Sequence, residues 1–415
     1  MMSTGADGVC QGGALRRGVR VGRRGLSRAL RGRLRGTVRE WRARMSIETT
    51  PIDREDRLTG VLLGVAVGDT LGLPREGLSR RRAARLFGAA PLEHRFVLGR
   101  GMISDDAEHA CMTAQALLAA PGDAARFARS LGWRLRGWLA AMPAGVGYAT
   151  LRAIVKLWLG FSPERSGVCS AGNGPAMRAP ILGAALALEP SRIEPMVRAS
   201  TRLTHTDPRA EEGARIIALA AAYAAVRAPE QVNPAELLAR LRERVSDGEL
   251  RRRLDCAAEL LARRASAEDF VAAIGLHEGV SGFIVDTVPA ALFCWLANVG
   301  DFRRAVEDVI LLGGDADSTG AIVGGLAGAT LGARAIPETW LGGIADTPRS
   351  VGWMRRLGAR LARAFRGEGA GAAPGERASG GEGPLGLFWP VLPVRNLIFL
   401  VLALKHGFRR MLPPY

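Results

Sequence analysis

Apolar residues recur in helical runs along most of the chain, and short polar or glycine- and proline-rich segments separate these runs. Many runs are rich in Ala and Leu, which favour helices over strands. We expect Pro289 to interrupt one of them. The pattern predicts an all-α fold with helices at about 53–67, three between 107 and 160, and others from 179 and at 191–203, 209–227, 234–245, 248–264, 280–298, 300–311 and 321–331.

Two acidic clusters stand at the starts of apolar helical runs. The first consists of Ser104, Asp105 and Asp106, and the second of Asp315, Asp317 and Ser318. Hydroxyl and carboxylate oxygens are ligands that suit hard cations such as Mg²⁺ or Mn²⁺. A single cluster of this kind is equally explained as a helix cap with a solvated neighbour. Because the pattern occurs twice, we expect the two clusters to face each other and form a two-metal site.

A third acidic segment follows the first predicted helix. The apolar residues from Leu62 end in a loop that carries Asp69 and Glu76. Three acidic helix ends are more than capping requires. We expect Asp69 to orient this loop.

Five spaced motifs then resemble the ADP-ribosylglycohydrolase family over roughly residues 55–345. They are Gly68-Asp-Thr-Leu-Gly with Glu76, Ser104-Asp-Asp106, Gly172-Asn-Gly-Pro-Ala-Met-Arg178, Thr204-His205 with Asp207-Pro208, and Gly313-Gly-Asp-Ala-Asp-Ser318. The resemblance implies a compact orthogonal multi-helix domain that carries two Mg²⁺ or Mn²⁺ ions. It also implies hydrolytic removal of ADP-ribose from a modified protein or a small ADP-ribosyl conjugate.

The resemblance further implies roles for individual residues. The expected metal ligands are Ser104, Asp105, Asp106, Asp315, Asp317 and Ser318; the expected substrate contacts are Ser170, Gly172, Asn173, Gly174 and His205; and the catalytic candidates are Glu76 and then Asp106. Ala107 and Ala316 depart from the family, which commonly has hydroxyl residues there. The glycine loop also suits phosphate binding through its backbone N–H groups. The alternative function is a non-enzymatic ADP-ribose- or metal-binding member of the same fold.

The charge of the chain is concentrated at its N-terminus. The net charge is +17, and residues 1–44 supply +10 of it through 12 Arg against two acids. Such a segment is expected to be disordered, and we interpret Met45 as the start of the protein. A basic arm for nucleic acid or lipid and a transit peptide are the alternatives. We expect no nucleic-acid binding by the folded domain, which we assign to residues 45–366.

The cysteines indicate the compartment. Five scattered cysteines, without metal-ligand or redox spacing, suit a reducing cytosol, so we expect a cytoplasmic protein.

The C-terminus combines a linker and an apolar tail. Residues 367–384 are predicted to be flexible, and residues 385–415 to form a tail helix. Pro390, Pro393, Arg395 and Asn396 leave only 397–404 as an unbroken apolar run, short of a membrane span. We expect the tail to dock on the domain or in a dimer interface, with attachment to a membrane surface as the less favoured alternative.

Overall fold

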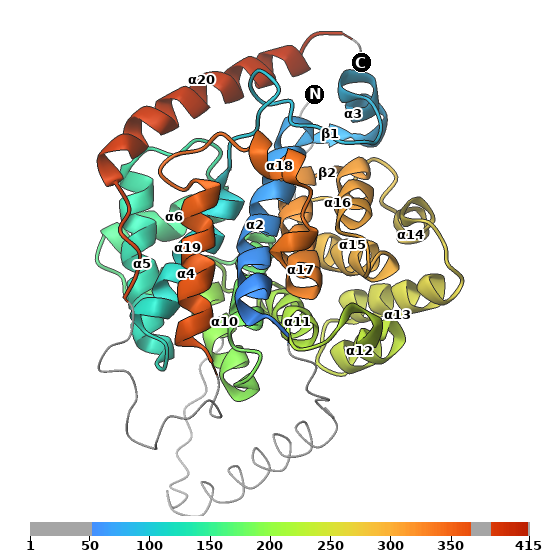
Figure 1. Cartoon of the computed structure of the whole chain (residues 1–415), viewed down its shortest axis with the longest axis horizontal. Coiled ribbons are helices and arrows are strands. Elements are labelled where there is room, and N and C mark those ends of the chain that lie inside the picture. Colours follow the sequence, from blue (N-terminus) through green and yellow to red (C-terminus); the bar gives the residue numbers. More distant parts are fainter. Residues whose placement is uncertain (1–51, 367–382, 414–415) are drawn as a thin grey trace, which may run out of the picture. The chain divides into compact units, whose positions relative to one another are not determined.

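The computed structural model describes residues 52–366 and 383–413, and helices dominate both ranges (Figure 1). The all-α prediction is therefore confirmed. The extension at 1–44 and almost all of the linker at 367–384 lie outside the described residues. In chain order the helices are α2 (Arg54–Gly72), α3 (Arg80–Phe87), α4 (Asp105–Ala119), α5 (Ala124–Ala140), α6 (Tyr148–Trp158), α7 (Pro163–Ser166), α8 (Gly174–Met177), α9 (Ala179–Ala185), α10 (Ile193–Arg202), α11 (Pro208–Ala224), α12 (Pro234–Arg242), α13 (Gly248–Ala262), α14 (Ala267–Ala273), α15 (Ile284–Ala297), α16 (Phe302–Leu311), α17 (Ala316–Leu331), α18 (Glu338–Gly343), α19 (Val351–Ala364) and α20 (Leu392–Arg410).

Helices α2 and α17 lie side by side at the centre of the domain (Figure 1). Glycines recur every four residues along the contact, so the two backbones almost touch. A Cβ atom at Gly64 would lie 2.0 Å from the carbonyl oxygen of Gly324, and one at Gly68 would lie 1.9 Å from that of Gly320. The glycines therefore fix how closely the central helices approach, and with them the loops at one end of the pair.

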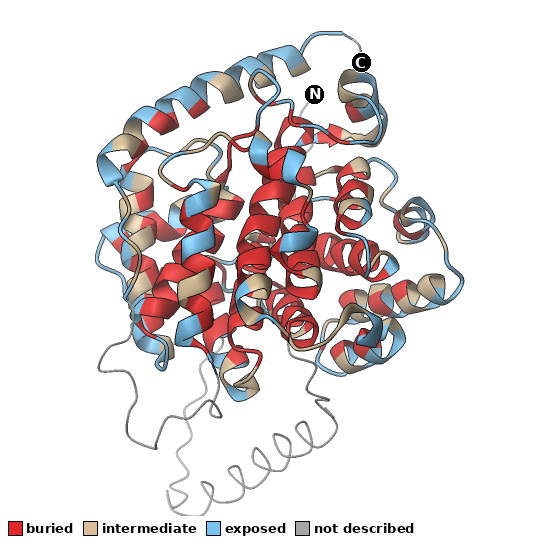
Figure 2. Ribbon diagram, in the orientation of Figure 1, coloured by how far each residue is buried: buried red, intermediate tan, exposed pale blue. Residues whose placement is uncertain are grey.

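Other helices enclose this pair. Helices α4 and α19 pack on α2, and helices α11, α15 and α16 pack on α17. Figure 2 shows the result, with the two central helices almost entirely buried. Burial on all sides explains their near-continuous apolar sequence.

The first predicted helix continues past its expected end. Helix α2 runs to Gly72 rather than stopping near Val67, so Asp69 lies in its last turns and not in the following loop. The glycines there serve close packing and do not end the helix.

A two-residue strand pair ties the loop after α2 to the start of α17. Strands β1 (Leu78–Ser79) and β2 (Gly313–Gly314) are antiparallel, with Leu78 opposite Gly314. Gly314 has a φ of +80°, and a Cβ there would lie 2.1 Å from the carbonyl oxygen of Val280. Only glycine fits this close approach. The strand pair brings the segment of Glu76 beside the second acidic cluster.

Two prolines do not act as expected. Pro289 lies inside α15, which is continuous from Ile284 to Ala297 and buried along its length. Pro393 occupies the first turn of α20, where a missing N–H costs nothing. Helix α20 is therefore 19 residues long, far longer than the apolar run at 397–404.

Candidate functional site

A cavity of about 500 Å³ brings most of the predicted site residues together. Six segments that are separated in the sequence supply its walls. Its lining includes Glu76, Asp105, Asp106, Tyr148, Arg152, Cys169, Ser170, Gly172, Asn173, Gly174, His205, Asp315, Asp317 and Ser318. The only predicted site residue that is not part of this lining is Ser104.

The two acidic clusters meet in this cavity. Ser318 Oγ donates a hydrogen bond of 3.1 Å to Asp106 Oδ2, although the two residues are 212 positions apart. Asp106, Asp317 and Ser318 are buried, and Asp105 is half-buried. The hydroxyl-and-carboxylate pattern at two helix starts thus corresponds to one site in the fold.

Asp315 occupies the N-cap position of α17 without capping it. Its carboxylate accepts a hydrogen bond from Asn173 Nδ2, and Asn173 Nδ2 also lies 3.0 Å from Thr287 Oγ1. An ordinary cap would turn back to the helix N–H groups. Asp315 is instead held in the cavity by the glycine loop.

Ser104 does what a capping residue does. Its hydroxyl accepts a hydrogen bond from the Asp106 N–H at 3.4 Å as the N-cap of α4. Asp69 Oδ2 accepts hydrogen bonds from the N–H groups of Ser104 at 2.8 Å and Ala107 at 3.1 Å. Asp69 therefore holds the first turn of α4 rather than the loop after α2, and Ser104 is placed as a cap and not on the cavity wall.

Burial and mutual repulsion shape the electrostatics of the acidic wall. Burial first, and then neighbouring carboxylates, raise the pKa values of Asp105, Asp106 and Asp317 well above the ordinary range. Burial likewise raises the pKa of Asp69 to about 7. Without an added cation, the wall holds protons that carboxylates normally release.

Glu76 stands at a more open part of the cavity. Its side chain is exposed, yet desolvation raises its pKa, with the nearby guanidinium of Arg410 acting in the opposite direction and Asp315 adding to the rise. A cavity-lining carboxyl group whose pKa is raised holds its proton more readily than a free one, which suits general acid–base chemistry.

The glycine loop packs against His205. A Cβ at Gly172 would lie 3.2 Å from His205 Nε2, and one at Gly174 would lie 3.1 Å from His205 Cε1. Two backbone N–H groups of the loop are already used, because Gly172 donates to Ser170 Oγ and Asn173 donates to the carbonyl oxygen of Gly282. Fewer donors are thus left for a phosphate than the sequence suggests.

His205 is uncharged at neutral pH. Burial and the guanidinium of Arg178 lower its pKa to about 3. Its Nδ1 lies 2.8 Å from Thr204 Oγ1, so Nε2 is the nitrogen beside the glycine loop. The ring can exchange a hydrogen bond with a ligand but supplies no positive charge.

Sequence reasoning missed the wall that α6 contributes. Tyr148 and Arg152 line the cavity, and the guanidinium carbon of Arg152 lies 5.4 Å from the centre of the Tyr148 ring. Tyr148 is 74% exposed. The only sequence signal was an exposed aromatic beside a cation at a helix start, which does not distinguish a binding wall from an ordinary surface.

A buried ion-pair network behind the first acidic cluster was also missed. Glu108 pairs with Arg349 and accepts a hydrogen bond of 2.6 Å from Trp138 Nε1. Asp346 pairs with Arg395 of α20 at 2.6 Å. Since the partners lie between 30 and 241 residues apart, no local pattern could have shown them.

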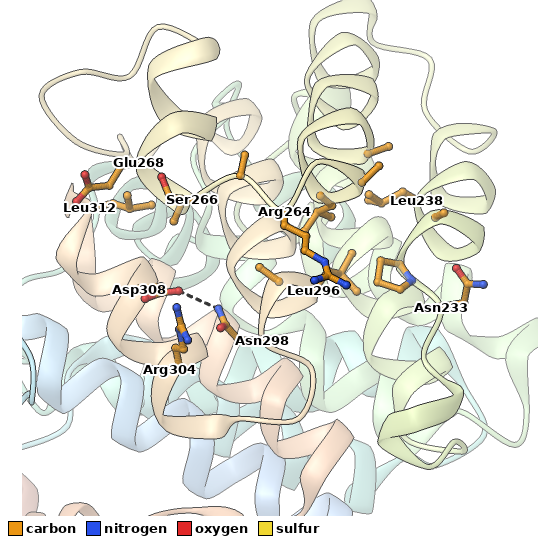
Figure 3. Close-up of a pocket in the computed structure, with 18 of the residues that line it drawn as sticks. Asn233, Leu238, Arg264, Ser266, Glu268, Leu296, Asn298, Arg304, Asp308 and Leu312 are labelled. Carbon is orange, nitrogen blue, oxygen red and sulfur yellow. Dashed lines mark hydrogen bonds between the residues drawn. The ribbon is translucent and has the colours of Figure 1, made fainter.

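A larger cavity of about 780 Å³ lies elsewhere in the domain (Figure 3). Figure 3 shows Asp308 hydrogen-bonded to Asn298, with Arg304 close by and mainly aliphatic residues around them. It contains no gathering of carboxylates, so its size does not make it the better candidate for hydrolysis.

The side chains of the acidic cavity are of the kind that bind cations, but they are not arranged around a single point. Asp106 Oδ1 and Asp69 Oδ1 are buried without a hydrogen-bond partner. Among the described residues, however, no three Asp, Glu, His or Cys side chains form a set that could hold a metal ion as they stand. The carboxylates of the acidic wall therefore suit a cation by their chemistry, although they do not converge on one point.

Comparison with known proteins agrees with the motifs. The family model for ADP-ribosylglycohydrolase matches residues 50–371, a range that ends before α20. The chain is 32% identical over 298 residues to an uncharacterized protein of Archaeoglobus fulgidus, covering 70% of this chain and 92% of the relative. It is 30% identical over 298 residues to the ADP-ribosyl-(dinitrogen reductase) glycohydrolase of Rhodospirillum rubrum, covering 69% and 89%.

A solved structure points the same way. An ADP-ribosylglycohydrolase-related protein complex is similar at a TM-score of 0.57 and 30% identity, covering 75% of this chain and 98% of that chain. The family model spans most of the sequence, including all five motifs. The chain belongs to the ADP-ribosylglycohydrolase family.

Proposed function

We propose that this protein is a metal-dependent hydrolase that releases ADP-ribose from a modified protein side chain or a small ADP-ribosyl conjugate. The observation that carries the proposal is the meeting of two distant acidic clusters in one cavity, beside a glycine loop and a neutral histidine. Family membership supports the reaction class. One similar protein is named for dinitrogen reductase, and another, from Pseudomonas putida, for ADP-ribosylarginine.

The chemistry of the acidic wall fits two Mg²⁺ or Mn²⁺ ions. Hard oxygen donors dominate it, burial and then neighbouring carboxylates raise the pKa values of Asp106 and Asp317, and Asp106 Oδ1 has no hydrogen-bond partner. The ions would be held by Asp105, Asp106, Asp315, Asp317 and Ser318. When bound, they would neutralise the cluster and polarise a water. Ser104 is left out of this set because it caps α4 away from the cavity lining.

We assign proton transfer and substrate contact to different side chains of the cavity. Glu76 is our first candidate to move a proton, because it lines the cavity and has a raised pKa. Asp106 is the second candidate, through its unpartnered oxygen. ADP-ribose would be contacted by the glycine loop and the histidine that line the same cavity, namely Ser170, Gly172, Asn173, Gly174 and His205. The neutral ring of His205 would exchange a hydrogen bond with it.

The test is incubation with peptides that carry ADP-ribose on arginine or on serine. Each reaction is run with Mg²⁺, with Mn²⁺ and with a chelator, and free ADP-ribose is measured by chromatography. We expect metal-dependent release from at least one linkage, which also identifies the bond. Binding of ADP-ribose without release from either peptide would favour the non-enzymatic alternative.

A further inference from the structure

Helix α20 faces the rest of the domain with its polar residues. Arg395 donates to Asp346 Oδ2 at 2.6 Å, and Asn396 Nδ2 donates to the carbonyl oxygen of Ala141 at 2.7 Å. Both side chains are buried. A helix that docks on a soluble domain usually buries an apolar stripe, whereas α20 buries these two polar side chains together with Leu392 and Phe399.

The polar contacts continue along the same face. His406 Nε2 lies 2.7 Å from the carbonyl oxygen of Phe96, and Arg410 donates to that of Leu73 at 3.0 Å. Phe399 packs against Phe96 on this face, and Leu402 and Ala403 pack against the same cluster. Polar anchors along the length of α20 therefore set which side of the helix points outward.

The outward side of α20 is apolar. The exposed residues there are Val394, Leu397, Ile398, Leu400, Val401, Leu404 and Phe408, each between 41% and 64% exposed. At about 100° per residue they cover an arc of roughly 160°, wider than a helix–helix seam requires. Figure 2 shows exposed residues along the length of α20, with buried and intermediate ones between them.

The charged side chains of the C-terminal segment are all basic. Residues 383–415 contain no Asp or Glu. Lys405 and Arg409 are exposed beside the apolar strip, and Phe388 and Trp389 are exposed before the helix. Basic residues beside a broad apolar face, with an aromatic residue at one end, are typical of helices that lie in the surface of an anionic membrane.

We propose that α20 attaches this protein to the surface of an anionic lipid bilayer, with its axis in the plane of the interface. By length and hydropathy alone, Trp389–Arg410 would suffice to cross a membrane. A crossing would break the buried Arg395–Asp346 ion pair and pull Arg395 and Asn396 from their partners.

A second copy of the chain fits the strip less well. A paired-helix seam is narrow and flanked by charges of both signs. Here Ile398 and Leu400 widen the apolar face, and no acid in the segment could pair with Lys405 or Arg409 of another copy.

The test is co-sedimentation of the full-length protein with vesicles. One set contains phosphatidylcholine alone, and the other also contains phosphatidylglycerol. We expect binding to the anionic vesicles, at least a tenfold loss for Leu397→Ser with Leu404→Ser, and roughly a fivefold loss for each charge removed in Lys405→Gln with Arg409→Gln. The matched control is Val155→Ser with Leu159→Ser, which removes two exposed apolar residues from α6 and its end and should bind like wild type.

Because residues 1–44 are present in every variant, differences between variants report α20. Equal binding by wild type and both α20 variants would overturn the proposal, as would equal losses in the α6 control. Retention of the protein in vesicles after alkaline carbonate would show a span instead. Dimerisation that the Leu397/Leu404 variant abolishes, without vesicle binding, would assign the strip to a second copy.

Discussion

Among single residues, Asp317 is a buried carboxyl group that is surrounded by other carboxyl groups. It is 4% exposed, and burial, Glu76 and Asp315 all raise its pKa. Asp317→Asn keeps the shape and removes one charge. We expect the metal-free variant to be at least as stable as metal-free wild type, and the rise in Tm on adding Mn²⁺ to shrink sharply. Thermal unfolding with and without Mn²⁺ measures both effects.

The matched control for Asp317 is Asp308→Asn. Asp308 is a half-buried acid whose pKa is also raised by burial, but it lines the larger cavity. That variant should keep the full metal-induced rise in Tm. The proposed role of Asp317 fails if its own variant also keeps that rise.

The raised pKa values predict how metal-free stability changes with pH. A carboxyl group with a pKa near 3.8 when unfolded and about 7 when folded, such as Asp69, binds more protons in the folded state between those values. Stability from such groups is lost as pH rises through the folded pKa. His205, with its pKa lowered to about 3, acts oppositely, but only below its ordinary value of 6.5.

Between about pH 6.5 and 8 only the carboxyl effect remains. We therefore expect the Tm of chelator-treated protein to fall across this range. With Mn²⁺ the fall should flatten or reverse, because the ions bind the deprotonated cluster. A Tm that rises with pH in the chelator would contradict the raised pKa values.

At the scale of elements, the contact between α2 and α17 admits no added atom. In Gly64→Ala the new Cβ would lie 2.0 Å from a backbone oxygen of α17, so the helices must separate. We expect a loss of about 3 kcal/mol or more in the free energy of unfolding. Urea denaturation measures it. Gly137→Ala in α5, where nothing lies within 4 Å of the new Cβ, should be neutral or slightly stabilising.

Helix α20 also supports the site through its buried ion pair. Arg395 contacts Asp346 and donates to the carbonyl oxygen of Ile103, next to the first acidic cluster. Arg395→Met would leave Asp346 buried and unpaired, which we expect to cost about 3–5 kcal/mol of unfolding free energy. Denaturant titration gives the value.

The exposed pair of Arg355 with Glu338 provides the comparison. Arg355→Met should cost less than about 1 kcal/mol, because solvent screens that pair. Equal costs for the two arginine variants would show that α20 is not held by its ion pair.

At the scale of the molecule, local patterns predicted much of the helical order and the two acidic clusters, and the family resemblance added the other predicted residues of the cavity. Helix α11, for example, begins at Pro208, one residue before its predicted start. The same pattern did not separate Ser104, which caps α4, from Asp315, which does not cap α17. That difference depends on Asn173, a residue 142 positions from Asp315. The inward polar face of α20 was hidden for the same reason, since its partners are remote.

The account's central claim is that carboxylates from two distant segments form one divalent-cation site. Equilibrium binding of Mn²⁺, followed by its electron paramagnetic resonance signal, tests it most directly. We predict two bound ions per chain in wild type and in Asp308→Asn, and at most one in Asp106→Asn. A wild-type chain that binds no Mn²⁺, or an Asp106→Asn variant that keeps both ions, would contradict the account.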